Sequence, residues 1–196
     1  MSLAAYHDGQ RRLQDAFDSR RIADRLDEVT YAALLSPAQA AMIHAAPMFF
    51  LATADGAGRP DCSFKGGAPG FVRALDAQTL AWGDYDGNGQ FRSLGNALAN
   101  PHVGLLFVDW LKPARLRVNG RAQVDRDDPL LAQWPGAQLV VRVAITQVFP
   151  NCPRYIPRMA ITEPSPFWPQ AQAPAPRPGW KDDPRFHDAL PEKDRR

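Results

Sequence analysis

The sequence predicts a mainly β fold, an antiparallel barrel with flanking short helices. Beyond Pro47 the chain consists of short apolar runs that are bounded by turn residues, which is the pattern of β-strands. About seven such runs follow one another, most are joined by hairpin-length turns, and two brief helical stretches interrupt them. With 196 residues, of which 45% are hydrophobic, the chain is long enough to bury one core.

Residues 1–46 are expected to form helices that precede the barrel. The first helix is expected over residues 11–28, where apolar residues recur at roughly helical spacing among many charges: Leu13, Phe17, Leu26 and Val29. The next helix has Ser36 as its N-cap and Pro37 at its first position, and Pro47 ends it.

Residues 47–161 are expected to form the barrel. The expected strands are 48–54, 61–66, 71–75, 79–83, 103–110, 115–124 and 138–149. The turn after the first of these strands is the stretch "DGAGRP", which suits a tight hairpin. Two short helices interrupt the strands, one from about Gln90 to Ala99 and one over residues 126–136, where Asp128 precedes a proline.

Residues 162–196 are expected to form a proline-rich tail. After Ile161 the composition changes sharply, and four prolines occur from Pro169 to Pro178. Such a segment has too little apolar content to build a core, so we expect it to be disordered or extended along the surface.

Composition and patterning exclude several classes of protein. The 23 basic and 21 acidic residues give a net charge of +2 and no electrostatic case for nucleic acid or an anionic membrane. No apolar run reaches the roughly 18 residues of a membrane span and no secretory signal is recognisable, so we expect a cytoplasmic protein.

Cys62 and Cys152 form no C-x-x-C pair and are expected to be reduced thiols, with Cys62 in the core. The four histidines are scattered without ligand spacing.

The stretch "GDYDGNGQFRSLGN" raises the question of a metal site. Asp84, Asp86 and Asn88 followed by Gly89 begin like an EF-hand calcium loop. The twelfth position, however, is Gly95 instead of the required glutamate, and a strand precedes the loop in place of a helix. We therefore expect no metal here.

The same stretch has the composition of a phosphate site. Gly87 and Gly89 let the backbone turn closely, Arg92 offers a planar fork of donors, and Ser93 adds a hydroxyl at the first turn of the expected helix. On local chemistry alone the alternative is a solvated helix start with a capping serine.

Two longer stretches carry a resemblance to a known family. Residues Phe50 to Gly67 have the pattern F-x-A-T-A-D…G-R-P-D-C-S-x-K-G-G, and Asn151 to Tyr155 read N-C-P-R-Y. Together with the hairpin and the stretch above, their order and spacing resemble the pyridoxamine 5'-phosphate oxidase-like FMN-binding split barrels. The resemblance covers Ala46 to Tyr155 and is greatest to a bacterial group of predicted flavin-nucleotide-binding proteins.

The resemblance implies a split barrel that forms a homodimer, with two FMN molecules in clefts between the subunits. It places the flavin phosphate at the helix start, at Arg92 and Ser93. It implies further flavin contacts along the second strand at Ser63, Phe64 and Lys65, at the pocket wall at Trp82, Gly83, Asp84 and Asn88, and from the partner subunit at Asn151, Arg154 and Tyr155.

Physical chemistry agrees with this placement. An isoalloxazine ring needs flat apolar walls, which Phe64 and Trp82 suit. Lys65 is expected to face a buried anion or a flavin oxygen, and the alternative is an edge-strand lysine that opposes aggregation. Asp84 would repel a phosphate, so it is expected to pair with Arg92 or Lys65, or to accept from backbone amides.

Departures from the family limit the function that is predicted. The vitamin B6 oxidases carry a basic, histidine-containing C-terminal segment, and residues 151–168 replace it here. The oxidases also have an arginine and a lysine where this chain has Ser63 and Ala68, so oxidation of pyridoxamine phosphate is not expected. We expect an FMN-dependent oxidoreductase that takes hydride from NADH or NADPH, with no nameable substrate. The alternatives are a flavin-storing protein without turnover and a split barrel that holds heme or a deazaflavin.

Overall fold

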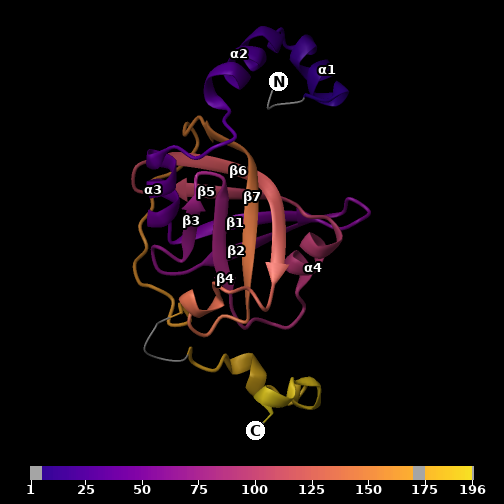
Figure 1. Ribbon diagram of the computed structural model, residues 1–196, viewed down its shortest axis with the longest axis vertical. Coiled ribbons are helices and arrows are strands. Elements are labelled where there is room, and N and C mark those ends of the chain that lie inside the picture. The colour runs from indigo at the N-terminus through magenta and orange to yellow at the C-terminus, as the bar shows by residue number, and fades with distance from the viewer. Residues whose placement is uncertain (1–5, 170–174, 196) are drawn as a thin grey trace.

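The computed structural model describes residues 6–169 and 175–195, and its centre is one antiparallel sheet of seven strands (Figure 1). The strands are β1 (Met48–Ala54), β2 (Pro60–Gly66), β3 (Val72–Asp76), β4 (Thr79–Asp84), β5 (His102–Asp109), β6 (Ala114–Asp125) and β7 (Leu139–Asn151). Their order across the sheet is β2-β1-β5-β6-β7-β4-β3, so β2 and β3 are its edges.

The sheet curls into an open barrel. Strands β1 and β4 are not neighbours in the sheet, yet the rings of Phe49 and Trp82 lie 5.2 Å apart in an edge-to-face arrangement. Lys65 Nζ on β2 likewise lies 3.0 Å from Asp84 Oδ1 at the end of β4. These contacts across the barrel confirm the prediction of a mainly β, antiparallel split barrel.

The core lies inside the curled sheet. Its largest fully buried side chains are Trp82, Phe49, Phe107, Ile43, Leu51, Leu80 and Leu105. Successive strand residues point to opposite faces, and the burial of β1 and β6 alternates accordingly. Trp134, outside the barrel, packs on Ala81 and Val140 and donates its indole N–H to the carbonyl of Phe71 at 2.9 Å.

The N-terminal segment forms two helices in place of the single one expected over residues 11–28. These are α1 (Asp8–Ala16) and α2 (Arg20–Thr30), which lie at one end of the barrel (Figure 1). Between them Asp18 adopts a left-handed conformation with φ 47°, and the amide of Ser19 donates to the carbonyl of Gln14 at 2.7 Å. This is a Schellman ending, and because Asp stands where glycine is usual, the sequence carries only a weak signal for it.

Two further helices flank the barrel. In α3 (Pro37–Ala45) the expected cap is confirmed, since Ser36 Oγ accepts from the amide of Gln39 at 3.3 Å and the Gln39 side chain accepts from the amide of Ser36 at 2.8 Å. The helix α4 (Arg92–Ala99) contacts β1 through Asn96, whose side-chain amide Nδ2 donates a hydrogen bond to Thr53 Oγ1 at 3.2 Å.

The short helix expected over residues 126–136 is reduced to one 3₁₀ turn, η1 (Leu131–Gln133). Asp128 accepts from the amide of Leu130 at 2.8 Å, as a cap does, but its carboxylate also binds Arg142 on β7. Gly136, with φ +83°, then turns the chain into β7.

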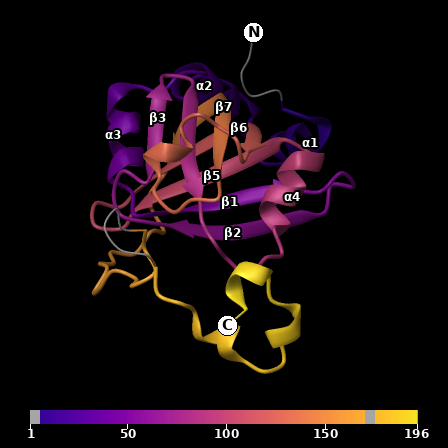
Figure 2. The ribbon, with the colours of Figure 1, turned by 60° about the horizontal axis from the view of Figure 1, so that its bottom comes forward.

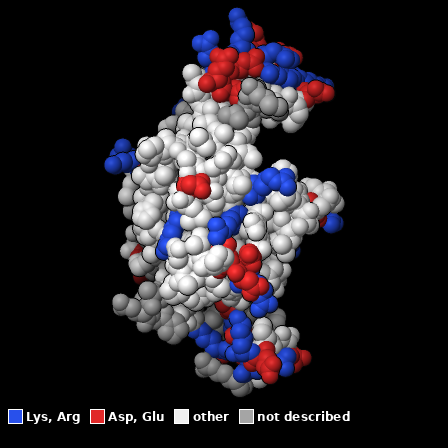
Figure 3. All heavy atoms as spheres, in the orientation of Figure 1, with Lys and Arg blue, Asp and Glu red and all other residues white. Residues whose placement is uncertain are grey.

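The described part of the tail contains 3₁₀ turns (Figures 1 and 2). Charged side chains are densest at the two ends of the molecule in the view of Figure 3. Residues 175–195 include η2 (Gly179–Asp182), η3 (His187–Ala189) and η4 (Glu192–Asp194) and lie at the end opposite to α1 and α2. Among the helices that the structure describes, none combines the length and the apolar character of a membrane span.

Candidate functional site

A cleft of about 530 Å³ opens between β2, the end of β4, the loop of residues 85–91 and the start of α4. Phe167 and Pro169 complete its lining from the chain that follows β7. The volume lies within the range of small-molecule sites, about 300–1,000 Å³. The cleft therefore lies where the edge strand β2 approaches the end of β4 across the curled sheet.

Two buried polar atoms of the lining have no hydrogen-bond partner among the described residues. They are the hydroxyl of Ser63 on β2 and the indole N–H of Trp82 on β4. A buried donor without a partner costs roughly 1–3 kcal/mol, and native proteins rarely leave one. Both atoms are therefore candidates for contact with a polar ligand.

The two aromatic residues expected as flat walls are placed differently. Trp82 is 1% exposed and packs against Phe49, so little of its ring is open to the cleft. Phe64 is 58% exposed and its ring meets Phe50 on the outer face of the sheet, at 6.1 Å between centroids. Phe91 and Phe167, about half exposed, add aromatic surface at the mouth.

Lys65 and Asp84 form an ion pair inside the cleft wall. The ammonium of Lys65 donates to Asp84 Oδ1 at 3.0 Å, and the two side chains are 22% and 12% exposed. Of the partners expected for Asp84, the structure selects Lys65. Gly83, the neighbour of Asp84, offers only backbone, because a Cβ there would lie 2.6 Å from Trp134.

The loop into α4 is built from local turns. Asn88 Oδ1 accepts from the amide of Gln90 at 3.0 Å, Gly89 has φ +74°, and Phe91 has φ 49°. Phe91 is the N-cap residue of α4, and its side chain makes no capping hydrogen bond within the described structure. The amides of the first turn of α4 therefore have no side-chain cap, and such a helix end attracts anions.

Arg92 and Ser93 lie at this helix end beside Asp61 of β2. The Ser93 hydroxyl donates to Asp61 Oδ2 at 2.8 Å, whereas the guanidinium of Arg92 is 3.9 Å from Asp61 and its side chain is 72% exposed. The donors of Arg92 are thus largely available to a ligand. Asp61 places a carboxylate next to the same position and opposes the binding of a second anion.

Nine of the residues expected at the flavin line this one cleft: Ser63, Phe64, Lys65, Trp82, Gly83, Asp84, Asn88, Arg92 and Ser93. Asn151, Arg154 and Tyr155 do not line it within the chain, and they were expected to act on the partner subunit. Asn151, at the end of β7, lies opposite Arg115 of β6 in the strand register. The side-chain atoms Asn151 Oδ1 and Arg115 Nε are buried without hydrogen-bond partners in the described structure.

Several residues of the cleft were missed from the sequence. Asp61, Tyr85, Asp86, Phe91 and Phe167 line it, and burial raises the pKa of Tyr85. Asp61 could have been found from the sequence, because strand alternation places it on the same face of β2 as Ser63 and Lys65. Asp86 lies in the loop, where no such periodicity indicates which residues face the cleft. Phe167 lies far along the chain, so only the fold brings it there.

The two cysteines of the chain are both exposed. The prediction that Cys62 is a core residue is wrong: it is exposed, because it faces outward on the edge strand β2. Among the residues that the structure describes, no group of three or more histidines, cysteines and acids is placed to hold a metal ion.

A second hollow, of about 850 Å³, is apolar and borders α3. We call it the apolar groove; it is lined by Ala38, Met42, Ala45, Ala46, Pro47, Met48, Phe50, Val108, Asp109, Trp110, Leu111, Met159, Ala160 and Ile161. Phe50 of the groove contacts Phe64, a residue of the cleft lining, with 6.1 Å between the ring centroids.

Comparisons with known proteins give one family and a fold. Residues 35–162 match the family described as pyridoxamine 5'-phosphate oxidase. A candidate pyridoxamine 5'-phosphate oxidase from Lactobacillus delbrueckii is 23% identical with a TM-score of 0.51, over 62% of this chain and 99% of its own. HupZ from Group A Streptococcus is 19% identical with a TM-score of 0.50, over 59% of this chain and 93% of the HupZ chain. A comparison with curated proteins gives no match.

Proposed function

The chain belongs to the pyridoxamine 5'-phosphate oxidase family, and on that basis we propose that it binds FMN in the cleft and acts as an FMN-dependent oxidoreductase. The observation that carries the proposal is the lining of the cleft. It combines the uncapped start of α4 and the exposed Arg92 at one end with the unpartnered Ser63 hydroxyl and Trp82 indole N–H further in.

The lining suits the parts of FMN. Arg92 and the first-turn amides of α4 would hold the phosphate. Ser63 and Trp82 would bond the polar atoms of the ribityl chain or the ring edge, and Phe91 and Phe167 would cover apolar ring surface. Lys65, already paired with Asp84, would carry its positive charge close to the ring.

When bound, FMN supplies the hydride chemistry, so the protein needs no acid or base of its own for that step. The residues of the chain bind the cofactor, orient it and exclude water from one face. We propose NADH or NADPH as the hydride donor and assign no acceptor. Oxidation of pyridoxamine phosphate is not proposed, because residues 151–168 carry no histidine in the segment that follows the barrel.

We further propose that the active form is a homodimer with a cleft at each side of the interface. The apolar groove is lined almost entirely by apolar side chains and is open at the surface, and its Phe50 contacts Phe64 of the cleft lining. In this arrangement Asn151, Arg154 and Tyr155 reach the flavin of the other subunit.

The first test is the visible spectrum of the purified protein after incubation with excess FMN and removal of the free cofactor. Retained absorption of oxidised flavin supports the proposal, and its absence contradicts it; a Soret band would indicate heme instead. Rapid mixing with NADH and NADPH then tests turnover. A flavin that stays oxidised with both donors argues for storage.

Replacing Arg92 with alanine tests the phosphate contact. A charge-assisted hydrogen bond contributes roughly 1.5–3 kcal/mol, so FMN should bind about ten- to a hundredfold more weakly. Riboflavin, which lacks the phosphate, should bind almost unchanged. Equal losses for both ligands in a fluorescence titration would show that Arg92 does not contact the phosphate.

Asp61→Asn is the matched variant with the opposite expectation. The amide still accepts the hydroxyl of Ser93, but the negative charge beside Arg92 is gone. FMN should therefore bind several-fold more tightly while riboflavin is unaffected. Weaker FMN binding in Asp61→Asn would place the phosphate elsewhere in the cleft.

A further inference from the structure

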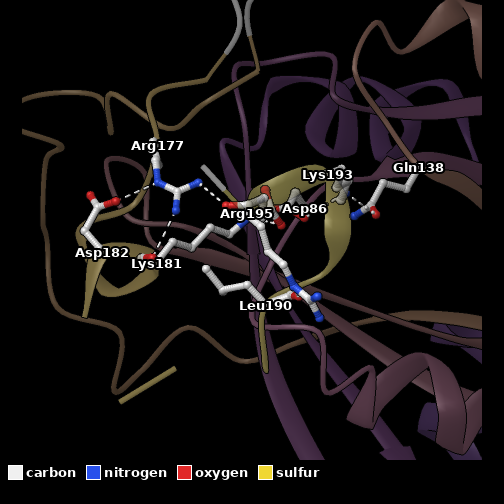
Figure 4. A network of polar contacts seen from close by, with 9 residues as sticks. Asp86, Gln138, Arg177, Lys181, Asp182, Leu190, Lys193 and Arg195 are labelled. Atoms are coloured by element: carbon white, nitrogen blue, oxygen red, sulfur yellow. Dashed lines mark hydrogen bonds and ion pairs between the residues drawn. The ribbon is translucent and has the colours of Figure 1, made fainter. Parts of the chain in front are cut away.

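The described C-terminal residues 175–195 form a small folded unit that lies beside the loop of residues 85–91 (Figures 2 and 4). Arg177 organises it: the guanidinium donates to Asp182 Oδ1 at 2.8 Å and to the carbonyls of Lys181 and Asp194, each at 3.0 Å. Leu190 is 2% exposed. We call residues 175–195 the C-terminal unit.

Lys181 joins this unit to the rest of the protein. Its side chain is 4% exposed, and its ammonium donates to Asp194 Oδ2 at 2.9 Å and also to Asp86 Oδ2 in the loop. A buried ammonium is costly unless it is paired and hydrogen-bonded. Asp194 belongs to the C-terminal unit and Asp86 to the loop, so Lys181 has both of its ion pairs only when the unit and the loop are together.

The loop receives further support at Asp86 and at its beginning. Lys193 Nζ lies 3.2 Å from Asp86 Oδ1 and 3.3 Å from the side-chain oxygen of Gln138 (Figure 4). The amide of Gln138 donates to the carbonyl of Asp84 at 2.8 Å. Burial raises the pKa of Asp86, but hydrogen bonds from Lys181 and Lys193 outweigh it and leave the pKa below its usual value, so the carboxylate is charged at neutral pH.

Beyond Asp86 the loop has little to hold it. A side chain at Gly87 or Gly89 would meet nothing within 4 Å, and the hydrogen bond from Gln90 to Asn88 is local to the loop. Tyr85, at the start of the loop, packs on the cluster of Trp134 and Val140. Asp86 is therefore the residue through which the C-terminal unit holds the loop. The same loop lines the cleft and leads directly into Arg92.

We infer that the C-terminal unit is a clamp that positions the loop of residues 85–91 for the ligand of the cleft, with Lys181 as the positioning residue. A ligand that contacts the ordered loop favours the docked unit, and by reciprocity the docked unit raises the affinity for the ligand. The identity of the ligand as FMN rests on the proposed function, whereas the ordering of the loop does not.

Lys181→Met tests the clamp, because methionine keeps the length and apolar stem of the side chain but removes the charge. In the flavin-free protein we expect hydrogen exchange at least fivefold faster in residues 85–91 and 177–195, with β5 and β6 unchanged. Arg185→Met is the matched control: Arg185 belongs to the same unit but pairs with Asp183 on the surface, and it should leave the loop unchanged.

Loop exchange that is equal in Lys181→Met, Arg185→Met and the unaltered protein would overturn the inference, whether or not flavin binds. If Lys181→Met loses protection in β5 and β6 as well, Asp86→Asn provides the same test, since it leaves Lys181 paired with Asp194. There too, an unchanged loop would count against the clamp.

A flavin measurement tests the coupling. FMN should bind about five- to tenfold more weakly to Lys181→Met than to Arg185→Met, within the range usual for coupled sites. FMN should also slow exchange in residues 177–195 of the unaltered protein, and no longer do so in Lys181→Met. Equal FMN affinities in Lys181→Met and Arg185→Met, together with a loosened loop, would refute the coupling. An unaltered protein that binds no flavin would refute the proposed function, and the hydrogen-exchange test of the loop would still decide the clamp.

Discussion

Among single residues, Asp128 is a buried acid that joins two segments of the chain. Its side chain is 3% exposed, and its carboxylate accepts two hydrogen bonds from Arg142, one of them at 2.8 Å, as well as the amide of Leu130. Hydrogen bonds from Arg142 are the main cause that holds the pKa of Asp128 below its usual value. One carboxylate thus fixes the turn before β7 to β7 itself.

We predict that Asp128→Asn lowers the free energy of unfolding by about 1–3 kcal/mol at neutral pH, because Arg142 loses its charged partner. The loss is limited because the Arg142 side chain is 29% exposed and stays in contact with water. The pKa of Asp128 is lowered on folding, so the stabilisation is complete above its unfolded value near 3.8 and is lost as pH falls through the lower folded value.

Urea unfolding of both proteins at several pH values measures this effect. The difference between them should be constant above about pH 5, because the unfolded carboxyl is then ionised, and should shrink below about pH 4. A difference that does not change with pH would mean that the charge of Asp128 contributes nothing.

Among the elements, α4 is joined to its loop through a strained residue. Phe91 adopts the left-handed conformation with φ 49°, which costs a residue of this kind about 1–2 kcal/mol. Its ring is 50% exposed and lines the cleft instead of packing in the core. The strain is therefore not compensated by core packing, which points to a role for the ring at the site.

We predict that Phe91→Asn raises the free energy of unfolding by about 0.5–1 kcal/mol, because asparagine tolerates this conformation far better. FMN should bind several-fold more weakly, since an aromatic wall of the cleft is lost. Phe91→Ala is the control: it removes the ring and keeps the strain, so its affinity should fall equally without the gain in stability. Unchanged FMN affinity in both variants would show that the ring does not contact the ligand.

At the scale of the whole molecule, charge is distributed unevenly. Charged side chains are densest on α1, α2 and the C-terminal unit, and the barrel surface between them carries scattered ones in the view of Figure 3. The apolar groove lies on the barrel, between α3 and the ends of β1 and β5. A surface of this kind suits association with a second copy through the barrel.

We predict that Leu111→Asp converts a homodimer into monomers. Leu111 is 69% exposed and lines the groove, so the change places a charge in the proposed interface without disturbing the core. Leu98→Asp on α4, where the leucine is 71% exposed outside the groove, is the matched control and should remain dimeric. Light scattering of the two variants decides the matter, and a monomeric mass for the unaltered protein would refute the dimer outright.

The sequence by itself determined the elements that rest on local rules. The strands follow from alternation and turn residues, and α3 follows from Ser36 and Pro37, because these signals act between residues near in the chain. The start of α4 was recognisable for the same reason, from Gly87 and Gly89 followed by Arg92 and Ser93. The break between α1 and α2 was not, since Asp18 is a rare residue for the left-handed ending that it makes.

Only the tertiary structure decided which distant groups meet. Lys65 with Asp84, Asp61 with Ser93, and Asp86 with Lys181 are each joined across gaps of 19 to 95 residues. Charge pairing depends on distance in space. The chain has 21 acidic residues, and the residues next to each in the sequence do not show which base it will meet. The curl of the sheet and the docking of the C-terminal unit bring particular ones together, and so they assign Asp86 to a clamp and Cys62 to the surface.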